Sequence, residues 1–196
     1  CGKRPVGCRA PGYPVSEGLF EALRAAGAQY DSSVCPCLTY YAAKGAALAS
    51  IKLRGGRSAS RMDTPAVLRA PRNPYRVGRP YWRRGEGMIE LPVGVTPWQL
   101  PYIGTSLVVG GNRVATFLSK QMLGRELIHL ELHGFDVADA AEDGLDSLVP
   151  HRADLKRSAE TKLDALRAAL RVIRGAGYEF VTLAEAARRF RARPNP

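Results

Sequence analysis

Residues 4–34 read RPVGCRAPGYPVSEGLFEALRAAGAQYDSSV, and this stretch sets the fold class. Residues 4–8 predict a short strand that enters a Pro-Gly turn. Residues 16–26 predict a helix with Ser16 as its N-cap and one apolar face. Residues 29–34 predict the end of a second strand, which runs into a polar turn. A strand, a helix and a strand in this order indicate an α/β architecture with parallel strands.

The alternation of strands and helices continues in the second half of the chain. The predicted strands cover residues 88–93, 127–132 and 178–181, and the predicted helices follow Asn112, Leu155 and Thr182. Apolar residues recur every three or four positions from Leu155 to Ile173, which predicts an amphipathic helix of about five turns. Thr182 and Glu185 have the spacing of a capping box for the last helix. We therefore expect residues 1–196 to belong to a single α/β domain.

The positive charge of the chain is concentrated in one segment. The 196 residues include 29 basic and 18 acidic side chains, which gives a net charge of +11. Ten of the basic residues lie between Lys52 and Arg84, where Asp63 is the only acid. No apolar period of a helix or a strand persists between residues 42 and 85, so we predict a basic loop insertion with one β-hairpin. The charge then belongs to this insertion and not to the fold.

Composition and cysteine spacing exclude several classes of protein. The content of 45% hydrophobic and 24% charged residues is typical of a globular chain. No run of about 18 apolar residues occurs, so no transmembrane helix is predicted. The spacing of the four cysteines is not that of a zinc site; they are Cys1, Cys8, Cys35 and Cys37. A single residue separates the last two, whereas cysteine pairs that bind zinc are usually separated by at least two residues. We expect free thiols, which leave the cellular compartment open.

Three explanations fit a chain that starts with Cys1. A lipoprotein begins with cysteine after its signal peptide is removed. An N-terminal nucleophile hydrolase exposes a cysteine by self-cleavage and uses its own α-amine as the base. The third explanation is a chain whose upstream part is missing. Because the first predicted strand begins only a few residues after Cys1, we favour the third.

Loops that follow predicted strands carry the residues best suited to chemistry. In parallel α/β barrels the active site is built from the loops after the carboxyl ends of the strands. Three such loops, at residues 9–13, 31–33 and 133–136, hold unusual residues. His133 is suited to proton transfer near neutral pH, although a lone histidine at a strand end is more often structural. On a strand, His129 and His133 would lie about 13 Å apart, which disfavours a two-histidine metal site.

Three motifs stand in order along the chain. They are Arg9-Ala10-Pro11-Gly12-Tyr13, Tyr30-Asp31-Ser32-Ser33-Val34 and Leu130-Glu131-Leu132-His133-Gly134. Their order and spacing resemble the later motifs of the NodB-homology polysaccharide deacetylases. The strand at residues 88–93, the loop at 96–101 and the long C-terminal helix are also similar to that family. The resemblance covers nearly the whole chain except the basic insertion.

The resemblance implies the later βα units of a distorted parallel (β/α)7-type barrel that is incomplete at its N-terminus. Members of the family hydrolyse N- or O-acetyl groups of carbohydrates with a divalent metal, which we expect to be zinc. The resemblance assigns Arg9 to orienting the catalytic base and His133 to protonating the leaving group. Asp31 would support the acidic form of that histidine. Tyr13 would help to bind the oxyanion through its backbone amide.

The base and the metal ligands of the family have no counterpart in this sequence. The family carries them in a Thr-Phe-Asp-Asp motif and a His-Ser/Thr-x-x-His motif upstream of the arginine motif. Only eight residues precede Arg9, and no Asp-Asp pair occurs in the chain. We therefore expect the C-terminal portion of a deacetylase, inactive by itself, whose metal is held by a missing N-terminal segment or a complementing chain. The expected substrate is an acetylated carbohydrate or a related amide, and the family favours a cytoplasmic or peripheral location.

Aromatic residues and the basic segment leave other functions open. Trp98 and Tyr102 are candidates for lining a sugar-binding groove, because flat rings suit pyranose faces; ordinary packing is the alternative. A second hypothesis is a non-catalytic binding module whose arginines at 52–84, together with nearby aromatic rings, bind an anionic partner. A solvated loop explains the same segment, and nucleic acid is not the expected partner. A third hypothesis is an N-terminal nucleophile hydrolase that uses Cys1.

Overall fold

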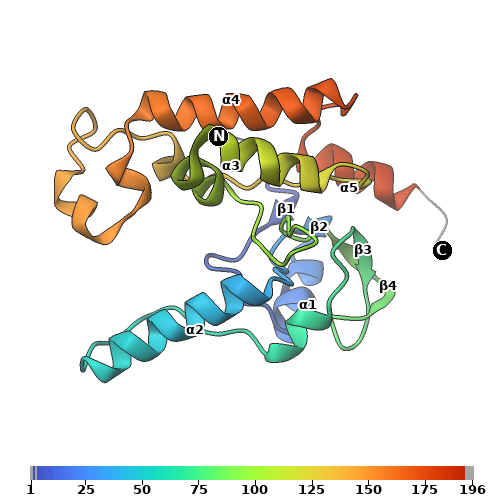
Figure 1. Ribbon diagram of the computed structural model, residues 1–196. Helices are drawn as coiled ribbons and strands as arrows, with labels where there is room; N and C mark the ends of the chain where they lie inside the picture. The colour runs from blue at the N-terminus through green and yellow to red at the C-terminus, as the bar shows by residue number, and fades with distance from the viewer. Residues whose placement is uncertain (1, 3, 193–196) are drawn as a thin grey trace. The chain divides into compact units, whose positions relative to one another are not determined.

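The computed structural model describes residues 2 and 4–192, and the chain divides into two compact units (Figure 1). Unit 1 contains residues 1–95 and 181–196, and unit 2 contains residues 96–180. The architecture is mixed α/β, and the four-stranded sheet belongs to unit 1. None of the described helices combines the length and the apolar composition that crossing a bilayer requires.

The sheet of unit 1 is open, with the strand order β1-β2-β4-β3. Its strands are β1 (Gly7–Cys8), β2 (Tyr30–Asp31), β3 (Tyr75–Val77) and β4 (Arg84–Glu90). β1, β2 and β4 run parallel to one another, whereas β3 pairs antiparallel with β4. This confirms the parallel strand-helix-strand unit predicted at the start of the chain. The carboxyl ends of the three parallel strands therefore meet at one edge of the sheet.

The described residues of unit 1 form the helices α1 (Glu17–Ala25), α2 (Leu38–Leu53) and α5 (Leu183–Arg191) and the 3₁₀ helix η1 (Pro65–Arg69). Of these, α1 and α5 begin at the caps that the sequence predicts. The Ser16 hydroxyl accepts from the N–H of Leu19 at 3.2 Å, as expected of an N-cap. The Thr182 hydroxyl likewise accepts from the N–H of Glu185 at 3.2 Å. Side-chain caps thus set the starts of α1 and α5, as the sequence predicted.

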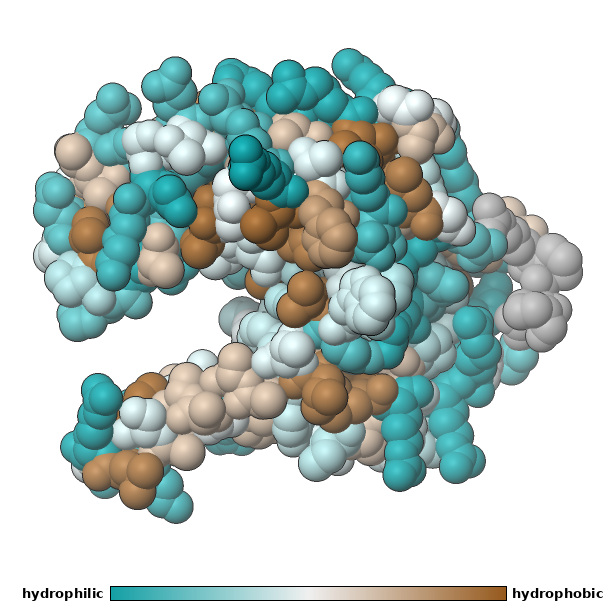
Figure 2. All heavy atoms as spheres, viewed as in Figure 1, coloured by the Kyte–Doolittle hydropathy of each residue, from teal (hydrophilic) through white to brown (hydrophobic). Residues whose placement is uncertain are grey.

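The basic segment at residues 42–85 is not a loop insertion, and the prediction for it was only partly right. The hairpin is present as β3 and β4, but α2 and η1 occupy much of the rest. Val67, Tyr75 and Tyr81 from this segment are buried with Phe20 and Val34 in the core of unit 1. The apolar period of the sequence did not reveal α2, because this helix has no buried residue and therefore no apolar stripe. In Figure 2 the visible surface of α2 is mostly pale, between the two ends of the hydropathy scale.

Unit 2 is built on two helices that pack against each other, α3 (Gly104–Met122) and α4 (Ala159–Gly175). Three short 3₁₀ helices connect them: η2 (Gly134–Asp136), η3 (Asp146–His151) and η4 (Asp154–Lys156). Leu107, Leu118, Met122 and Leu166 form the core between α3 and α4. The apolar spacing in residues 155–173 correctly predicted the buried face of α4. α3 begins before the predicted start at Asn112, and a kink at Gly111 divides it.

Two predicted strands are absent from the described structure. Residues 127–132 make one isolated bridge, between Ile103 and Glu131, and residues 178–181 make none. Ile128 and Leu130 pack against the α3–α4 core, so their alternation reflects burial on one side of an extended segment. No neighbouring strand pairs with that segment along its length. The strands that the structure describes form an open sheet and not a closed barrel.

Candidate functional site

The carboxyl edge of the sheet in unit 1 carries polar residues that the sequence singled out. Arg9 follows β1, Asp31 ends β2 and Glu90 ends β4. Because these strands are parallel, their ends bring the three side chains to the same edge. Asp31 and Glu90 are completely buried, and Arg9 is partly buried. The side chains of Arg9, Asp31 and Glu90 form the first candidate cluster.

Arg9 is fixed against the loop that follows β2. Its Nε donates to the Ser32 carbonyl and its Nη2 donates to the Ser32 hydroxyl, each at 3.0 Å. The Ser32 hydroxyl in turn donates to the Leu91 carbonyl at 2.9 Å. The N–H of Ala10 donates to the Ser33 hydroxyl at 2.7 Å. The loops after β1, β2 and β4 are therefore joined around a guanidinium with a defined direction, which a lysine would not reproduce.

Asp31 and Glu90 form a buried carboxyl pair. Asp31 accepts from the N–H and the hydroxyl of Ser33 at 3.0 and 2.9 Å, and Glu90 Oε1 accepts from the N–H of Val34 at 3.0 Å. Burial raises the pKa of both carboxyls, and the charge of Asp31 raises the pKa of Glu90 further. The interaction between the two side chains opposes the rise in the pKa of Asp31 and adds to the rise in the pKa of Glu90. Glu90 is therefore the member of the pair whose neutral form is favoured more strongly.

Tyr13 lies in the turn after Arg9 with a left-handed backbone, at φ 64°. Its ring is buried and contacts the ring of Tyr40 edge to face, with centroids 5.4 Å apart. Its amide N–H donates to the Ala10 carbonyl at 3.0 Å. The amide assigned to the oxyanion is thus used by the turn, and an oxyanion would reach it only as a second acceptor.

A second polar cluster surrounds His133 in unit 2. His133 Nε2 lies 3.2 Å from Glu131 Oε1, and the imidazole is 52% exposed whereas Glu131 is buried. The backbone N–H of His133 donates to Asp136 Oδ2 at 2.8 Å. The Thr105 hydroxyl donates to the other oxygen of Asp136 at 2.9 Å. Glu131 thus orients the ring of His133, and Asp136 holds its backbone.

Gly104, the first residue of α3, allows the close packing behind His133. Its N–H donates to the Glu131 carbonyl at 2.7 Å. A Cβ at this position would overlap the carboxylate of Asp136 and the side chain of Leu132. Any larger residue would therefore displace Asp136, and with it the backbone of His133.

Asp31 belongs to unit 1 and His133 to unit 2. The carboxylate that faces His133 Nε2 is Glu131, which the motif assignment passed over. Sequence reasoning had not paired Glu131 with His133. The spacing of Glu131 and His133 could have indicated this contact, because side chains two residues apart on an extended segment point to the same side. Glu90 was also not predicted as a site residue. The one indication in the sequence was its position as an acidic residue at the end of an apolar strand.

The two aromatic residues proposed for a sugar groove have different surroundings. Tyr102 is buried in the core of unit 2, and its hydroxyl lies 2.8 Å from the Ser119 hydroxyl. The prediction that Tyr102 contacts a sugar was therefore wrong, because its ring faces α3 and not solvent. Trp98 is 69% exposed, and its Nε1 donates to Gln121 at 3.2 Å. Trp98 remains available to a ligand.

Two of the three aromatic rings of the basic segment are not available for stacking on a ligand, and the third, Trp82, is partly buried against the core of unit 1. Tyr75 and Tyr81 are buried, and the Tyr75 hydroxyl donates to the Tyr81 carbonyl at 2.9 Å. The Tyr81 hydroxyl donates to Asp63 at 2.6 Å, so the one acid of the segment is used internally. The two tyrosines of this segment therefore cannot act as the stacking partners that single-stranded nucleic acid binding uses.

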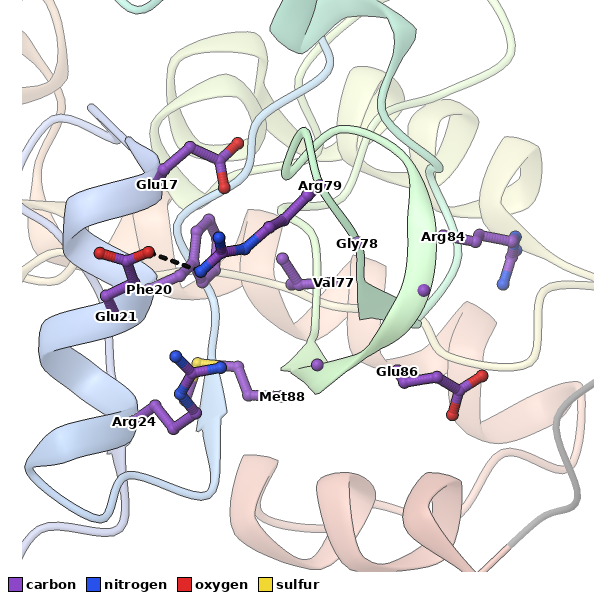
Figure 3. A pocket seen from close by; sticks show the side chains of 12 residues that line it. Glu17, Phe20, Glu21, Arg24, Val77, Gly78, Arg79, Arg84, Glu86 and Met88 are labelled. Atoms are coloured by element: carbon purple, nitrogen blue, oxygen red, sulfur yellow. Dashed lines mark hydrogen bonds and ion pairs between the residues drawn. The ribbon is translucent and has the colours of Figure 1, made fainter.

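A pocket of about 380 Å³ lies in unit 1 between α1 and the β3–β4 hairpin (Figure 3). Phe20, Val77 and Met88 contribute apolar surface to it, and Arg79 Nη2 pairs with Glu21 at 2.6 Å along one side. The part of β4 that lines the pocket ends at Met88, before Glu90. The pocket therefore lies apart from the Arg9, Asp31 and Glu90 cluster.

The metal expected from the resemblance has no fitting ligand set in the described residues. Within residues 2 and 4–192, no three His, Cys, Asp or Glu side chains are grouped so as to hold a metal ion. Asp31 and Glu90 supply only two side chains, and three of their four carboxyl oxygens already accept hydrogen bonds from Ser33 and Val34. Cys1, the nucleophile of the third hypothesis, lies outside the described residues.

Comparison with known proteins identifies no relative of the chain. No model of a protein family matches it, no curated protein matches it, and no solved structure matches its fold.

Proposed function

We propose that this chain is the C-terminal portion of a metal-dependent carbohydrate deacetylase of the NodB type. In this proposal the described units are the later βα units of a distorted (β/α)7 barrel. The observation that carries the proposal is the cluster of Glu131, His133 and Asp136, which presents one half-exposed imidazole on a buried carboxylate. The three ordered sequence motifs support the same conclusion.

His133 is the proton donor in this proposal. Hydrolysis of an amide builds negative charge on the carbonyl oxygen and requires a proton on the leaving nitrogen. A half-exposed imidazole can reach a substrate, and the Glu131 carboxylate at 3.2 Å from Nε2 holds its ring in one orientation. Asp136 fixes the backbone of the same residue. Orientation of this kind is what general acid catalysis demands of a side chain.

Arg9 is a positioning residue in this proposal. Its two hydrogen bonds to Ser32 leave the guanidinium in a fixed place at the carboxyl edge of the sheet. A fixed guanidinium orients a carboxylate better than a flexible ammonium does. The carboxylate base and the metal ligands would come from the parent protein outside this chain. In this proposal the residues of this chain orient the catalytic base and transfer a proton to the leaving group.

The experiment is acetate release by the product of the whole reading frame that contains this chain. The probes are N-acetylglucosamine oligomers and an O-acetylated sugar, each with added zinc or with a chelator. We expect His133→Gln to lower kcat by about 10²- to 10⁴-fold, the usual contribution of a general acid. His151→Gln, at an exposed histidine of η3, is the matched control and should leave kcat unchanged.

Two results would contradict the proposal. One is full activity of His133→Gln, which would remove the proton donor from the mechanism. The other is hydrolysis by residues 1–196 alone that a chelator does not affect. Binding of the oligomers by the whole product without any acetate release would instead support a non-catalytic binding module.

A further inference from the structure

The Cys35-Pro36-Cys37 segment has no part in the proposed hydrolysis, and it directly precedes α2. Both cysteines are buried, and neither is in a disulfide. The N–H of Cys37 donates to the Cys35 carbonyl at 2.8 Å, so the chain makes a tight turn around Pro36. Within this turn the Cys35 thiol donates a hydrogen bond to the sulfur of Cys37.

Cys37 is the N-cap of α2, and its sulfur faces several donors. The Thr39 hydroxyl lies 3.4 Å from the sulfur, and the backbone N–H groups of Thr39 and Tyr40 also act to lower its pKa. The Cys35 thiol first, and then these donors, lower the pKa of Cys37 from 9.0 to about 6 although burial opposes them. A helix N-terminus favours a thiolate for the same electrostatic reason.

Cys35 is the member of the pair that borders a surface pocket. Tyr13, Tyr40 and Lys44 line the same small pocket. Lys44 Nζ donates to the Gly12 carbonyl at 2.6 Å, which holds its ammonium group at the pocket. Cys35 therefore lines a small pocket of about 20 Å³, with the positive charge of Lys44 beside it.

We propose that Cys35 and Cys37 are a redox-active dithiol that closes to an intramolecular disulfide by exchange with a low-molecular-weight disulfide. The turn around Pro36, the hydrogen bond between the two thiols and the pocket beside Cys35 carry the proposal. It does not depend on the hydrolase activity proposed above.

The exchange takes two steps. Cys35 passes its proton to the Cys37 thiolate, and the Cys35 sulfur attacks the external disulfide, which forms a mixed disulfide and releases one thiolate. Cys37 loses the proton to that thiolate and attacks the Cys35 sulfur, which forms the Cys35–Cys37 bond and releases a second thiolate that takes a proton from water. Two protein thiols are oxidised, and the external disulfide is reduced to two thiols.

The test equilibrates the reduced chain with mixtures of reduced and oxidised glutathione, followed by acid quenching, alkylation and peptide mass spectrometry. Trypsin releases residues 25–44 as one peptide that contains Cys35 and Cys37 and no other cysteine. We expect this peptide to change from a doubly alkylated form to an internal disulfide as the share of oxidised glutathione rises. The thiolate absorbance of the reduced chain should titrate with a midpoint near pH 6.

Serine variants separate the pair from ordinary surface oxidation. Cys37→Ser, which keeps a good N-cap, should hold glutathione on Cys35 without an internal disulfide and should lose the titration near pH 6. Cys8→Ser, at a free cysteine outside the pair, should behave as the unaltered chain does. Double alkylation of the 25–44 peptide at every glutathione ratio would overturn the proposal. Accumulation of a glutathione adduct alone in the unaltered chain would also overturn it.

Discussion

At the residue scale, the buried carboxyl pair at the end of β2 and β4 has the largest consequence for pH. Glu90 is completely buried, and burial and the charge of Asp31 raise its pKa well above the usual value. Above about pH 4.5 the unfolded chain therefore loses this proton while the folded chain keeps it. The folded state then binds more protons than the unfolded state, so stability falls as the pH rises toward the folded pKa. The raised pKa of Asp31 acts in the same direction.

Glu90→Gln should remove part of this pH dependence. The amide keeps an acceptor for the N–H of Val34 and offers N–H donors to Asp31, but it does not titrate. Between about pH 5 and pH 8, we expect the free energy of unfolding to fall less for the variant than for the unaltered chain. Urea unfolding at several pH values measures the two slopes. Glu86→Gln, at an exposed acid of the same strand, is the control, and equal slopes for all three chains would refute the raised pKa of Glu90.

At the scale of elements, α2 differs from the other long helices because none of its residues is buried. Its first turns are held by the Tyr41 hydroxyl, which donates to the Asp63 carbonyl at 3.0 Å, and by Lys44 at Gly12. Leu53 at its other end is 88% exposed. Helix propensity therefore matters more for α2 than for α3 and α4, whose buried faces supply most of their stability.

Gly45→Ala should stabilise α2. The added methyl group meets only the end of Met62 at 3.7 Å, an ordinary contact, and alanine loses less backbone entropy than glycine. We expect a gain of about 0.5–1 kcal/mol in thermal or urea unfolding. Gly111→Ala is the matched control in α3, since its Cβ also meets open space but its φ is 72°. That variant should lose stability, and a gain in both variants would show that open space alone sets the effect.

At the scale of the whole molecule, each compact unit has its own hydrophobic core. The core of unit 1 gathers side chains from α1, η1 and the β3–β4 hairpin, including Phe20, Val67 and Tyr81. The core of unit 2 lies between α3 and α4 and includes Leu107 and Leu166. Separate cores allow each unit to open on its own in hydrogen exchange.

Leu107→Ala should weaken unit 2 selectively. Removing a fully buried leucine costs about 2–5 kcal/mol, and the loss falls on the α3–α4 core. We expect faster amide exchange in α3 and α4 with little change in β3 and β4. Val67→Ala should give the opposite pattern, with faster exchange confined to unit 1. Uniform loss of protection over both units in either variant would contradict separate cores.

Some parts of the structure were predictable because their causes lie within a few residues. The caps at Ser16 and Thr182 bond to amides three positions away, so the spacing alone reveals them. The buried face of α4 was equally clear from its apolar period. The strand expected at residues 127–132 failed for a different reason: alternation shows which side of a segment is buried, but not whether another strand lies beside it.

The candidate site shows the same division. Arg9 and His133 could be recognised from their neighbours along the chain as polar residues at the ends of extended segments, each followed by a turn. The folded molecule was needed to learn that Arg9 is bonded to Ser32, that Asp31 lies beside Glu90, and that Tyr102 and the tyrosines of the basic segment are buried. Local hydrogen bonds depend on spacing along the chain, whereas burial and pairing depend on which distant segments come together. For this reason the segment at residues 42–85 contributes to the core of unit 1 in the folded molecule, although its sequence is charged and has no apolar period.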